Sequence, residues 1–202
     1  VAGADGGGTA WVVDAHGAVF ARGEAAWRRV ELPSGGPVGA VAGVEAWGDH
    51  VALLGQEHAV VSHDAGTTWQ AVEAGGSVDA AAWSGGRLWL ARSDGLLRRW
   101  EPTQEGAVAV DVALPRGVRV RELQPLGGEQ LLLVDRAGDL WASSNLGRQW
   151  ATDPPDHADD PLVFAAVLGH GPLVGHRSGA VDTVALGRKA PLLQPFAPRA
   201  PD

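Results

Sequence analysis

Acidic side chains stand at four predicted hairpin turns, and a pair of carboxyl groups is the chemistry that hydrolyses a glycosidic bond. Asp14, Glu57, Asp94 and Asp135 each follow a β-branched or Leu-rich run and precede a second short apolar run. A glycosidase uses one carboxylic acid as general acid and a second carboxylate as base or nucleophile. Asp is also the default residue of a tight turn. The sequence therefore favours structural turns, with rim carboxylates of a glycosidase as the alternative.

Histidines and arginines accompany these turns and give the chain a candidate binding rim. Its members are polar residues at or beside the predicted turns: His16, His58, Arg92, Asp94, Asp135, Arg136, His176 and Arg177. Turns are solvated and polar in any protein, which is the simpler interpretation. The functional interpretation is a recognition surface for a protein or a glycan, with Arg side chains as anchors.

A further acidic group lies in the segment 152–161. Asp153, Asp156, Asp159 and Asp160 stand beside His157, and Ca²⁺ prefers several hard oxygen ligands. Their spacing matches no known metal-binding loop, however, and the prolines of the segment favour a stiff loop that is exposed to solvent. The seven histidines show no spacing typical of zinc ligands. We therefore expect neither a metal nor a cofactor.

Composition excludes several other classes of function. The 202 residues are 45% hydrophobic and 20% charged, enough for one domain with a buried core. No uninterrupted apolar stretch approaches the length of a membrane span. The net charge of −8 and the pI of about 5.3 argue against a nucleic-acid partner. Cysteine is absent, which excludes disulfides and cysteine catalysis.

An internal repeat predicts the fold. Residues 17, 58, 95, 138 and 179 mark five similar turns, at intervals of 41, 37, 43 and 41 residues. A period near 40 is typical of four-stranded propeller blades, and short apolar runs between Gly, Pro, Asp and Ser clusters favour strands. We predict an all-β fold, a β-propeller of about five mostly four-stranded blades in a single domain, 1–202. The expected repeats are 1–37, 38–77, 78–117, 118–161 and 162–196, followed by a Pro-rich tail, 197–202.

The first repeat is expected to be incomplete. Residues 1–8 are too rich in glycine for an innermost strand, so the first blade has three strands, or the chain is part of a longer propeller of six to eight blades. Three tryptophans near the start of the predicted fourth strands are expected to fill the space between neighbouring sheets: Trp27, Trp69 and Trp150.

One segment has the pattern of a tightly bonded turn. It reads Ser62-His-Asp64-Ala-Gly66-Thr-Thr68-Trp69. Asp64 can accept hydrogen bonds from turn N–H groups, and Gly66 can take a positive φ. Ser62 and Thr68 can bond locally, while the indole of Trp69 folds back onto the hairpin. A second copy keeps Ser, Gly and Trp but has Asn in place of Asp: Ser143, Asn145, Gly147 and Trp150.

These two motifs resemble the Asp-box, or BNR, repeats of a β-propeller superfamily. The superfamily includes sialidases, xyloglucanase-type glycosidases, sortilin-like receptor domains and photosystem II assembly-factor-like proteins. The first copy matches the S-x-D-x-G-x-T-W pattern fully, and the second matches it in part. In that superfamily the motif is a folding element on the face opposite the active site. The resemblance therefore implies a structural role for both copies.

The resemblance also narrows the expected function. A sialidase needs a Tyr nucleophile, and this chain has no tyrosine. The remaining branch implies a non-enzymatic binding or assembly scaffold that recognises a protein or glycan through the rim on the linker side. A glycoside hydrolase, or a fragment of one, is the alternative, and a structural module whose activity lies elsewhere is the third. The resemblance and the missing initiator Met lead us to expect a periplasmic or extracellular location.

Overall fold

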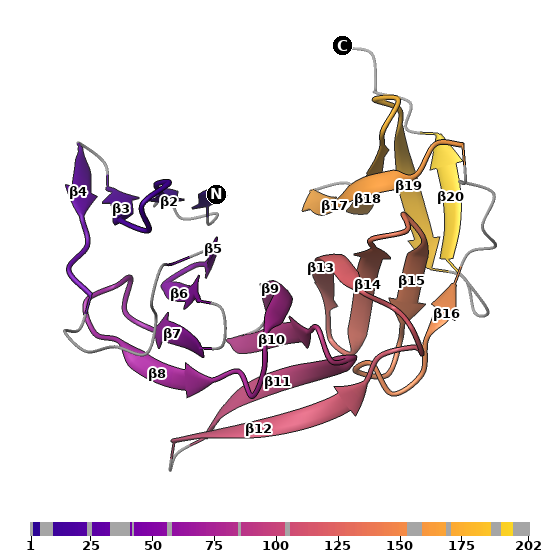
Figure 1. Ribbon diagram of the computed structural model, residues 1–202. Helices are drawn as coiled ribbons and strands as arrows, with labels where there is room; N and C mark the ends of the chain where they lie inside the picture. The colour runs from indigo at the N-terminus through magenta and orange to yellow at the C-terminus, as the bar shows by residue number, and fades with distance from the viewer. Residues whose placement is uncertain are drawn as a thin grey trace. The chain divides into compact units, whose positions relative to one another are not determined.

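Short apolar runs become strands throughout the part of the chain that the structure describes. The computed structural model describes residues 2–4, 10–23, 26–32, 41, 43–55, 58–84, 86–103, 106–152, 159–168, 171–186 and 191–195. These residues form strands β1 to β20 (Figure 1) and no helix, so they hold no helix that could cross a bilayer. The prediction of an all-β fold is confirmed.

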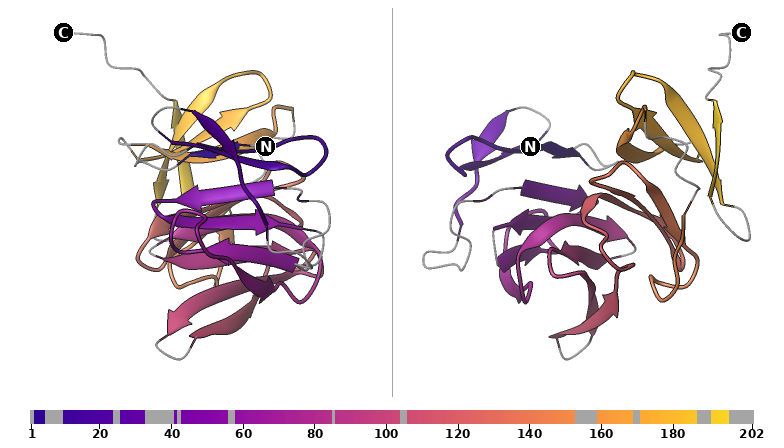
Figure 2. Two further views of the ribbon diagram at one scale, coloured as in Figure 1. Left: turned by 90° about the vertical axis from the view of Figure 1, so that its left-hand side faces the viewer. Right: turned by 45° about the vertical axis from the view of Figure 1, so that its right-hand side comes forward.

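The strands form five antiparallel sheets of four, each built from strands that follow one another in sequence (Figure 2). Sheet A contains β1 (Ala2–Ala4), β2 (Ala10–Val13), β3 (Val19–Arg22) and β4 (Trp27–Arg29). Sheet B contains β5 (Gly43–Trp47), β6 (His50–Leu54), β7 (His58–Ser62) and β8 (Gln70–Glu73). Sheet C contains β9 (Val78–Ser84), β10 (Arg87–Arg92), β11 (Leu96–Thr103) and β12 (Gly106–Ala113).

The remaining two sheets come from the second half of the chain. Sheet D contains β13 (Val120–Gly127), β14 (Gln130–Asp135), β15 (Leu140–Ser143) and β16 (Ala151–Thr152). Sheet E contains β17 (Leu162–Leu168), β18 (Gly171–His176), β19 (Val181–Leu186) and β20 (Pro191–Pro195). The chain divides into two compact units, Val1–Asp111 and Val112–Asp202. That all 202 residues form a single domain stays a prediction.

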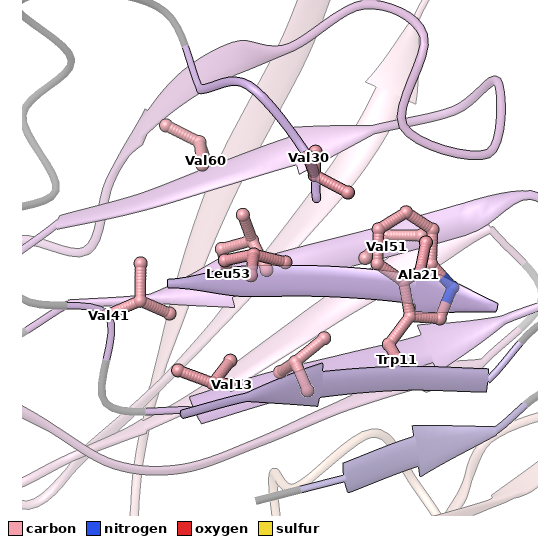
Figure 3. Close-up of a cluster of buried hydrophobic side chains, with 10 residues drawn as sticks. Trp11, Val13, Ala21, Val30, Val41, Val51, Leu53 and Val60 are labelled. Atoms are coloured by element: carbon pink, nitrogen blue, oxygen red, sulfur yellow. The ribbon is translucent and has the colours of Figure 1, made fainter. Parts of the chain in front are cut away.

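The core of the first unit lies between neighbouring sheets. Successive side chains of a strand point to opposite faces, so β6 contributes to two clusters. Val51 and Leu53 pack with Trp11 of sheet A in one cluster (Figure 3). Ala52 and Leu54 pack with sheet C residues in the other. Burial on both faces explains why this strand is a continuous apolar run rather than an alternating one.

The second unit is built in the same way. Leu132 and Val134 of β14 lie in one buried cluster with Leu162 of β17 and Val174 of β18. All four side chains are completely buried. Burying a side chain of this size contributes about 1.5–3 kcal/mol. Apolar contact between sheets D and E therefore holds their strands, and with them the turns at the strand ends, in fixed positions.

Two expectations about sheet A need correction. Ala2–Ala4 pairs with Ala10–Val12 as a first strand, so the sheet has four strands and not three. Ladder pairing uses only backbone groups, which Ala and Gly supply as well as larger residues. Trp27 does not fill an intersheet space: it begins β4, whose three residues are all exposed, and its side chain is 48% exposed.

The other two tryptophans of that group are more enclosed. Trp69 packs against the cluster between sheets A and B, where its ring meets Trp11 edge-on at 6.2 Å between centroids. Trp150 is half-buried. The expected intersheet packing therefore applies to Trp69.

Candidate functional site

Backbone hydrogen bonds tie the turns between second and third strands to the linkers that precede the first strands. Three equivalent bonds occur in sheets C, D and E: Ser93 N to Ser77 O at 2.8 Å, Arg136 N to Arg119 O at 2.8 Å, and Arg177 N to Pro161 O at 3.1 Å. We call the turns 14–18, 93–95, 136–139 and 177–180 the linker-side turns. Because each bond repeats at the same position of its sheet, the turns of sheets C, D and E are held in place by the repeated architecture.

The turn of sheet D shows how closely a linker approaches. Pro161 lies against Gly138, where an added Cβ would overlap the Cβ of the proline. Leu162 N donates a hydrogen bond to Gly138 O at 3.3 Å. The guanidinium of Arg121 donates to Leu162 O at 3.0 Å and to Arg136 O at 3.3 Å. Within this unit, the turn, the linker and the next strand form one bonded assembly.

The acidic residues of the turns bond to their own backbone. Asp14 Oδ1 accepts hydrogen bonds from His16 N at 2.7 Å and Ala18 N at 2.9 Å. The bonds from Ala18 and His16 lower the pKa of Asp14. Asp135 is buried and accepts bonds from Gly138 N, Asp139 N and the indole N–H of Trp141. Both carboxylates therefore act as turn formers.

A cluster of opposite charges lies at the linker-side end of sheet C. Arg92 is buried and forms ion pairs with Asp94 and, at 3.7 Å, with Asp111. Arg98 donates two hydrogen bonds to the Asp111 carboxylate, at 2.7 and 2.6 Å, and a third to Glu73 O at 3.0 Å. The Arg98 bonds lower the pKa of Asp111, so this carboxylate is no proton donor at neutral pH.

The sequence did not single out Arg98 and Asp111. They stand on the paired strands β11 and β12, 13 residues apart, and meet only through the register of that hairpin. A pair of opposite charges that face each other across two strands can indicate such a contact. This pattern can be recognised only when the register of the two strands is known.

His176 is held between two aspartates in sheet E. Its Nε2 lies 3.1 Å from Asp182 Oδ2, and its Nδ1 lies 3.1 Å from Asp160 O. The Asp160 carboxylate accepts bonds from Ser178 N at 2.8 Å and Ser178 Oγ at 2.7 Å. The side chain of His176 is buried. This group fastens the linker to the turn 177–180.

The four aspartates considered as weak metal ligands are not brought together in the structure, as far as it describes them. Asp160 serves the turn of sheet E, and Asp159 is exposed. Asp153 and Asp156 lie outside the described residues. Among the residues that the structure describes, no group of three or more His, Cys, Asp or Glu is placed to hold a metal ion.

The candidate binding rim thus separates into structural and accessible members. Arg92, Asp135 and His176 are buried and hold the turns in place. His58 is half-buried and begins β7 instead of lying in a turn. The accessible members are exposed residues of the linker-side turns: His16 and Asp94 in the first unit, Arg136 and Arg177 in the second. We call these four the linker-side surface residues.

Among the described rim carboxylates, Asp14 and Asp135 are engaged in their own turns, which does not suit the general acid of a glycosidase. The general acid requires a raised pKa, whereas the pKa values of Asp14 and Asp111 are lowered. Asp135 accepts hydrogen bonds from three donors, and Glu57 lies outside the described residues. Burial raises the pKa of Glu122 on β13, but its hydrogen-bond partner is the amide of Gln124.

The turn Ser62–Trp69 lies at the other end of sheet B. Ser62 Oγ accepts a bond from Gly66 N at 2.8 Å and donates to Asp64 Oδ1 at 2.8 Å. Asp64 in turn accepts bonds from Thr68 N at 2.8 Å and Thr68 Oγ1 at 2.6 Å. These bonds, led by the Thr68 hydroxyl, lower the pKa of Asp64 to about 2. Ala65 N donates to Asp49 O, which joins the turn to the connection between β5 and β6.

Gly66 is required at its position for two reasons. Its φ is +80°, in the region that favours glycine. An added Cβ would also lie 2.5 Å from Trp11 Cη2 and 3.3 Å from Trp69 Cζ2. The turn is therefore folded around the two indole rings.

The turn Ser143–Trp150 in sheet D repeats this geometry. Ser143 Oγ accepts a bond from Gly147 N at 2.9 Å, and Asn145 Oδ1 accepts one from Gln149 N at 2.9 Å. Leu146 N donates to Glu129 O in the connection between β13 and β14. Thus in sheets B and D these turns bond to the connection between first and second strands, away from the linker-side end.

Comparisons with known proteins place the fold. No family model and no curated protein matches the chain. Among solved structures it is similar to YCF48 bound to D1 peptide, with a TM-score of 0.67, 18% identity, and coverage of 95% of this chain and 64% of that chain. For YCF48 from Cyanidioschyzon merolae the TM-score is 0.67, the identity 15%, and the coverage 93% and 66%. For Prp20p from Saccharomyces cerevisiae the TM-score is 0.59 and the identity 14%, with coverage of 87% of this chain and 55% of that chain.

The chain therefore spans about two thirds of the length of the two YCF48 structures. At these identities the similarity concerns the fold alone. Together with the five consecutive four-stranded sheets, it shows that the fold of this chain is that of a β-propeller.

Proposed function

We propose that this protein is a non-enzymatic binding or assembly scaffold that recognises its partner through the linker-side surface residues of its second unit, Arg136 and Arg177. The observation that carries the proposal is the backbone bond between turn and linker at Arg136 and Arg177, which is repeated at Ser93 in sheet C. A loop that is already fixed loses little conformational freedom on binding. Binding residues are commonly displayed on loops that a rigid scaffold positions, and these turns fit that description.

A protein is the partner that we favour. Arg136 and Arg177 are exposed on neighbouring turns of the second unit, and Arg is enriched among the residues that contribute most to protein interfaces. The fold similarity to YCF48, which has been solved with a D1 peptide bound, supports the same class of partner. A glycan is the second class, which the resemblance to Asp-box propellers implies.

We also infer that the turns Ser62–Trp69 and Ser143–Trp150 are Asp-box turns with a structural role. Both turns share two hydrogen bonds, which support this inference. In each, a Ser hydroxyl accepts a bond from the Gly N–H, and an Asp or Asn side-chain oxygen accepts one from a later N–H. They lie at the end of their sheets opposite the linker-side turns, so a defect in them is expected to lower stability and not partner binding.

The alternative, a glycoside hydrolase, is tested directly by activity. The protein is incubated with chromogenic glycosides and polysaccharides, and the release of product is measured. Turnover that is lost on changing a rim carboxylate would favour the enzyme over the scaffold.

The proposal is tested by capture from the source organism with immobilised chain, beside a glycan array. A variant with Arg136→Glu and Arg177→Glu is compared with the control Arg148→Glu, an exposed Arg in the turn Ser143–Trp150. We expect the double variant to lose the partner and the control to retain it. Equal binding by both variants, or loss only in the control, would contradict the assignment of the surface.

A further inference from the structure

Two histidines meet at the end of sheet B that carries the turn Ser62–Trp69. His50 begins β6, and His63 follows Ser62, the last residue of β7. Because Val51 pairs with Ser62, the two histidines stand opposite each other at the end of this pair of strands. Their Nδ1 atoms lie 2.7 Å apart. Two ring nitrogens this close need an atom between them, either the hydrogen of an N–H···N bond or a metal ion.

Two tryptophans fix the ring of His50 in this position. Trp47, the partner of His50 across β5 and β6, stacks on it at 5.7 Å between centroids with an interplanar angle of 10°. Trp83 of sheet C also stacks on the ring of His50, at 5.3 Å between centroids with an interplanar angle of 28°. The ring of His63 meets both His50 and Trp83 edge-on. The imidazole of His50 is therefore oriented by packing, with Nδ1 directed at His63.

The distance between the nitrogens distinguishes the metals that could replace the proton. With metal–nitrogen bonds of about 2.0 Å, two nitrogens at neighbouring corners of a square-planar ion lie about 2.8 Å apart. In a tetrahedral zinc site they lie about 3.3 Å apart. The observed 2.7 Å matches the first arrangement closely. Cu²⁺ takes that tetragonal geometry and binds imidazole more tightly than Ni²⁺ or Zn²⁺ does.

The exposure of the two histidines and a nearby negative charge favour the binding of a cation at their Nδ1 atoms. His63 is exposed and His50 is partly exposed, so an ion can reach the nitrogens from solvent. An unprotonated imidazole is the form of His that binds a metal ion. The negative charge of Asp49 acts on His50 and would attract a divalent ion.

We propose that His50 and His63 form a two-nitrogen binding site for Cu²⁺, with both Nδ1 atoms at neighbouring corners of a tetragonal ion and water at its other positions. The site goes beyond the proposed scaffold function, because it lies at the end of sheet B opposite the linker-side turns. It also differs from a cluster of three or more acidic or His ligands, which the described residues do not contain.

The test is a titration of the metal-free full chain with CuSO₄ in the presence of glycine as a competing ligand. Bound Cu²⁺ quenches nearby tryptophans, so the fluorescence of Trp47 and Trp83 reports occupancy, and electron paramagnetic resonance counts the coordinated nitrogens. The variants are His63→Gln and His50→Gln. The matched control is His16→Gln, at a histidine whose side chain is 91% exposed and lies in a linker-side turn.

We expect one Cu²⁺ bound through two nitrogens, and a Kd raised about 100-fold when either ligand is lost, because the second nitrogen binds intramolecularly. His16→Gln leaves the Kd unchanged, and Ni²⁺ and Zn²⁺ bind more weakly than Cu²⁺. Since His50 packs against two indole rings, its variant can fold less well, and His63→Gln then decides. Unchanged binding in His63→Gln, a single coordinated nitrogen, or tighter binding of Zn²⁺ than of Cu²⁺ would overturn the proposal and leave a hydrogen bond between the imidazoles.

Discussion

Replacing Gly66 by Ala is expected to destabilise the protein through two separable effects. The residue has a φ of +80°, and a non-glycine residue in this region costs about 1–2 kcal/mol. The new methyl group would lie 2.5 Å from Trp11 Cη2, although Trp11 is completely buried and cannot swing away. Overpacking of this kind costs about 1–3 kcal/mol. After a gain of about 0.4–1 kcal/mol from the stiffer unfolded chain, the net loss is about 1–4.5 kcal/mol.

The matched control for this change is Gly95→Ala. Gly95 has a similar φ of +88°, but no described heavy atom lies within 4 Å of an added Cβ. Only the backbone effect applies there, so we expect a loss of about 1 kcal/mol. The free energy of unfolding is measured by urea denaturation with tryptophan fluorescence as the signal.

Repeating Gly66→Ala in a Trp11→Leu variant tests why Gly66→Ala lowers the free energy of unfolding more than Gly95→Ala does. Trp11→Leu removes the ring that the methyl group would strike, so the cost of Gly66→Ala should fall in that background, as a coupling between contacting residues. If Gly66→Ala and Gly95→Ala proved equally destabilising, or if the cost were the same with Leu at position 11, the packing argument for this turn would be refuted.

Three further predictions concern the carboxylates. The pKa of Asp64 is about 2 in the fold against 3.8 ordinarily, so its stabilising effect is complete above about pH 4 and is lost as the pH falls towards 2. The difference in Tm between the wild type and Asp64→Asn, followed against pH, should close over that interval, and a constant difference would show that the carboxylate charge does not matter. Asp135→Ala removes the acceptor of three buried donors and should cost about 2–3 kcal/mol in urea denaturation. Asp14→Ala, at an exposed turn, should cost clearly less, and equal effects would contradict the role of burial. A double-mutant cycle on Arg98 and Asp111 should give a coupling of about 1 kcal/mol that weakens at high salt, whereas zero coupling would make the pair incidental.

The fold was predictable because its signal is local and repeated. Each strand pair buries one or both faces, so apolar runs and turn residues recur with the period of a sheet. β17, Leu162–Leu168, is one such apolar run. Ala2–Ala4 was missed because three small residues give no apolar pattern, although their backbone pairs with β2. Trp27 was misplaced because residue type alone does not show which strand lies at the edge of a sheet.

The candidate site was only partly predictable from the sequence. Polar residues were expected at the linker-side turns, but whether one is exposed depends on the linker that packs over it. Asp135 and His176 are buried for that reason, and Arg136 and Arg177, each the next residue in sequence, are exposed. Arg98 with Asp111, and His50 with His63, lie 13 residues apart in sequence and meet through hairpin register. No spacing rule applied to the sequence alone predicts that register.

The central claim is that a partner binds the linker-side turns and not the opposite end of the sheets. Hydrogen–deuterium exchange of the chain, alone and in complex with the captured partner, tests this most directly. The account predicts slower exchange in 136–139 and 177–180 on binding, with 63–69 and 144–149 unchanged. Protection confined to 63–69 and 144–149, with the linker-side turns unaffected, would contradict it.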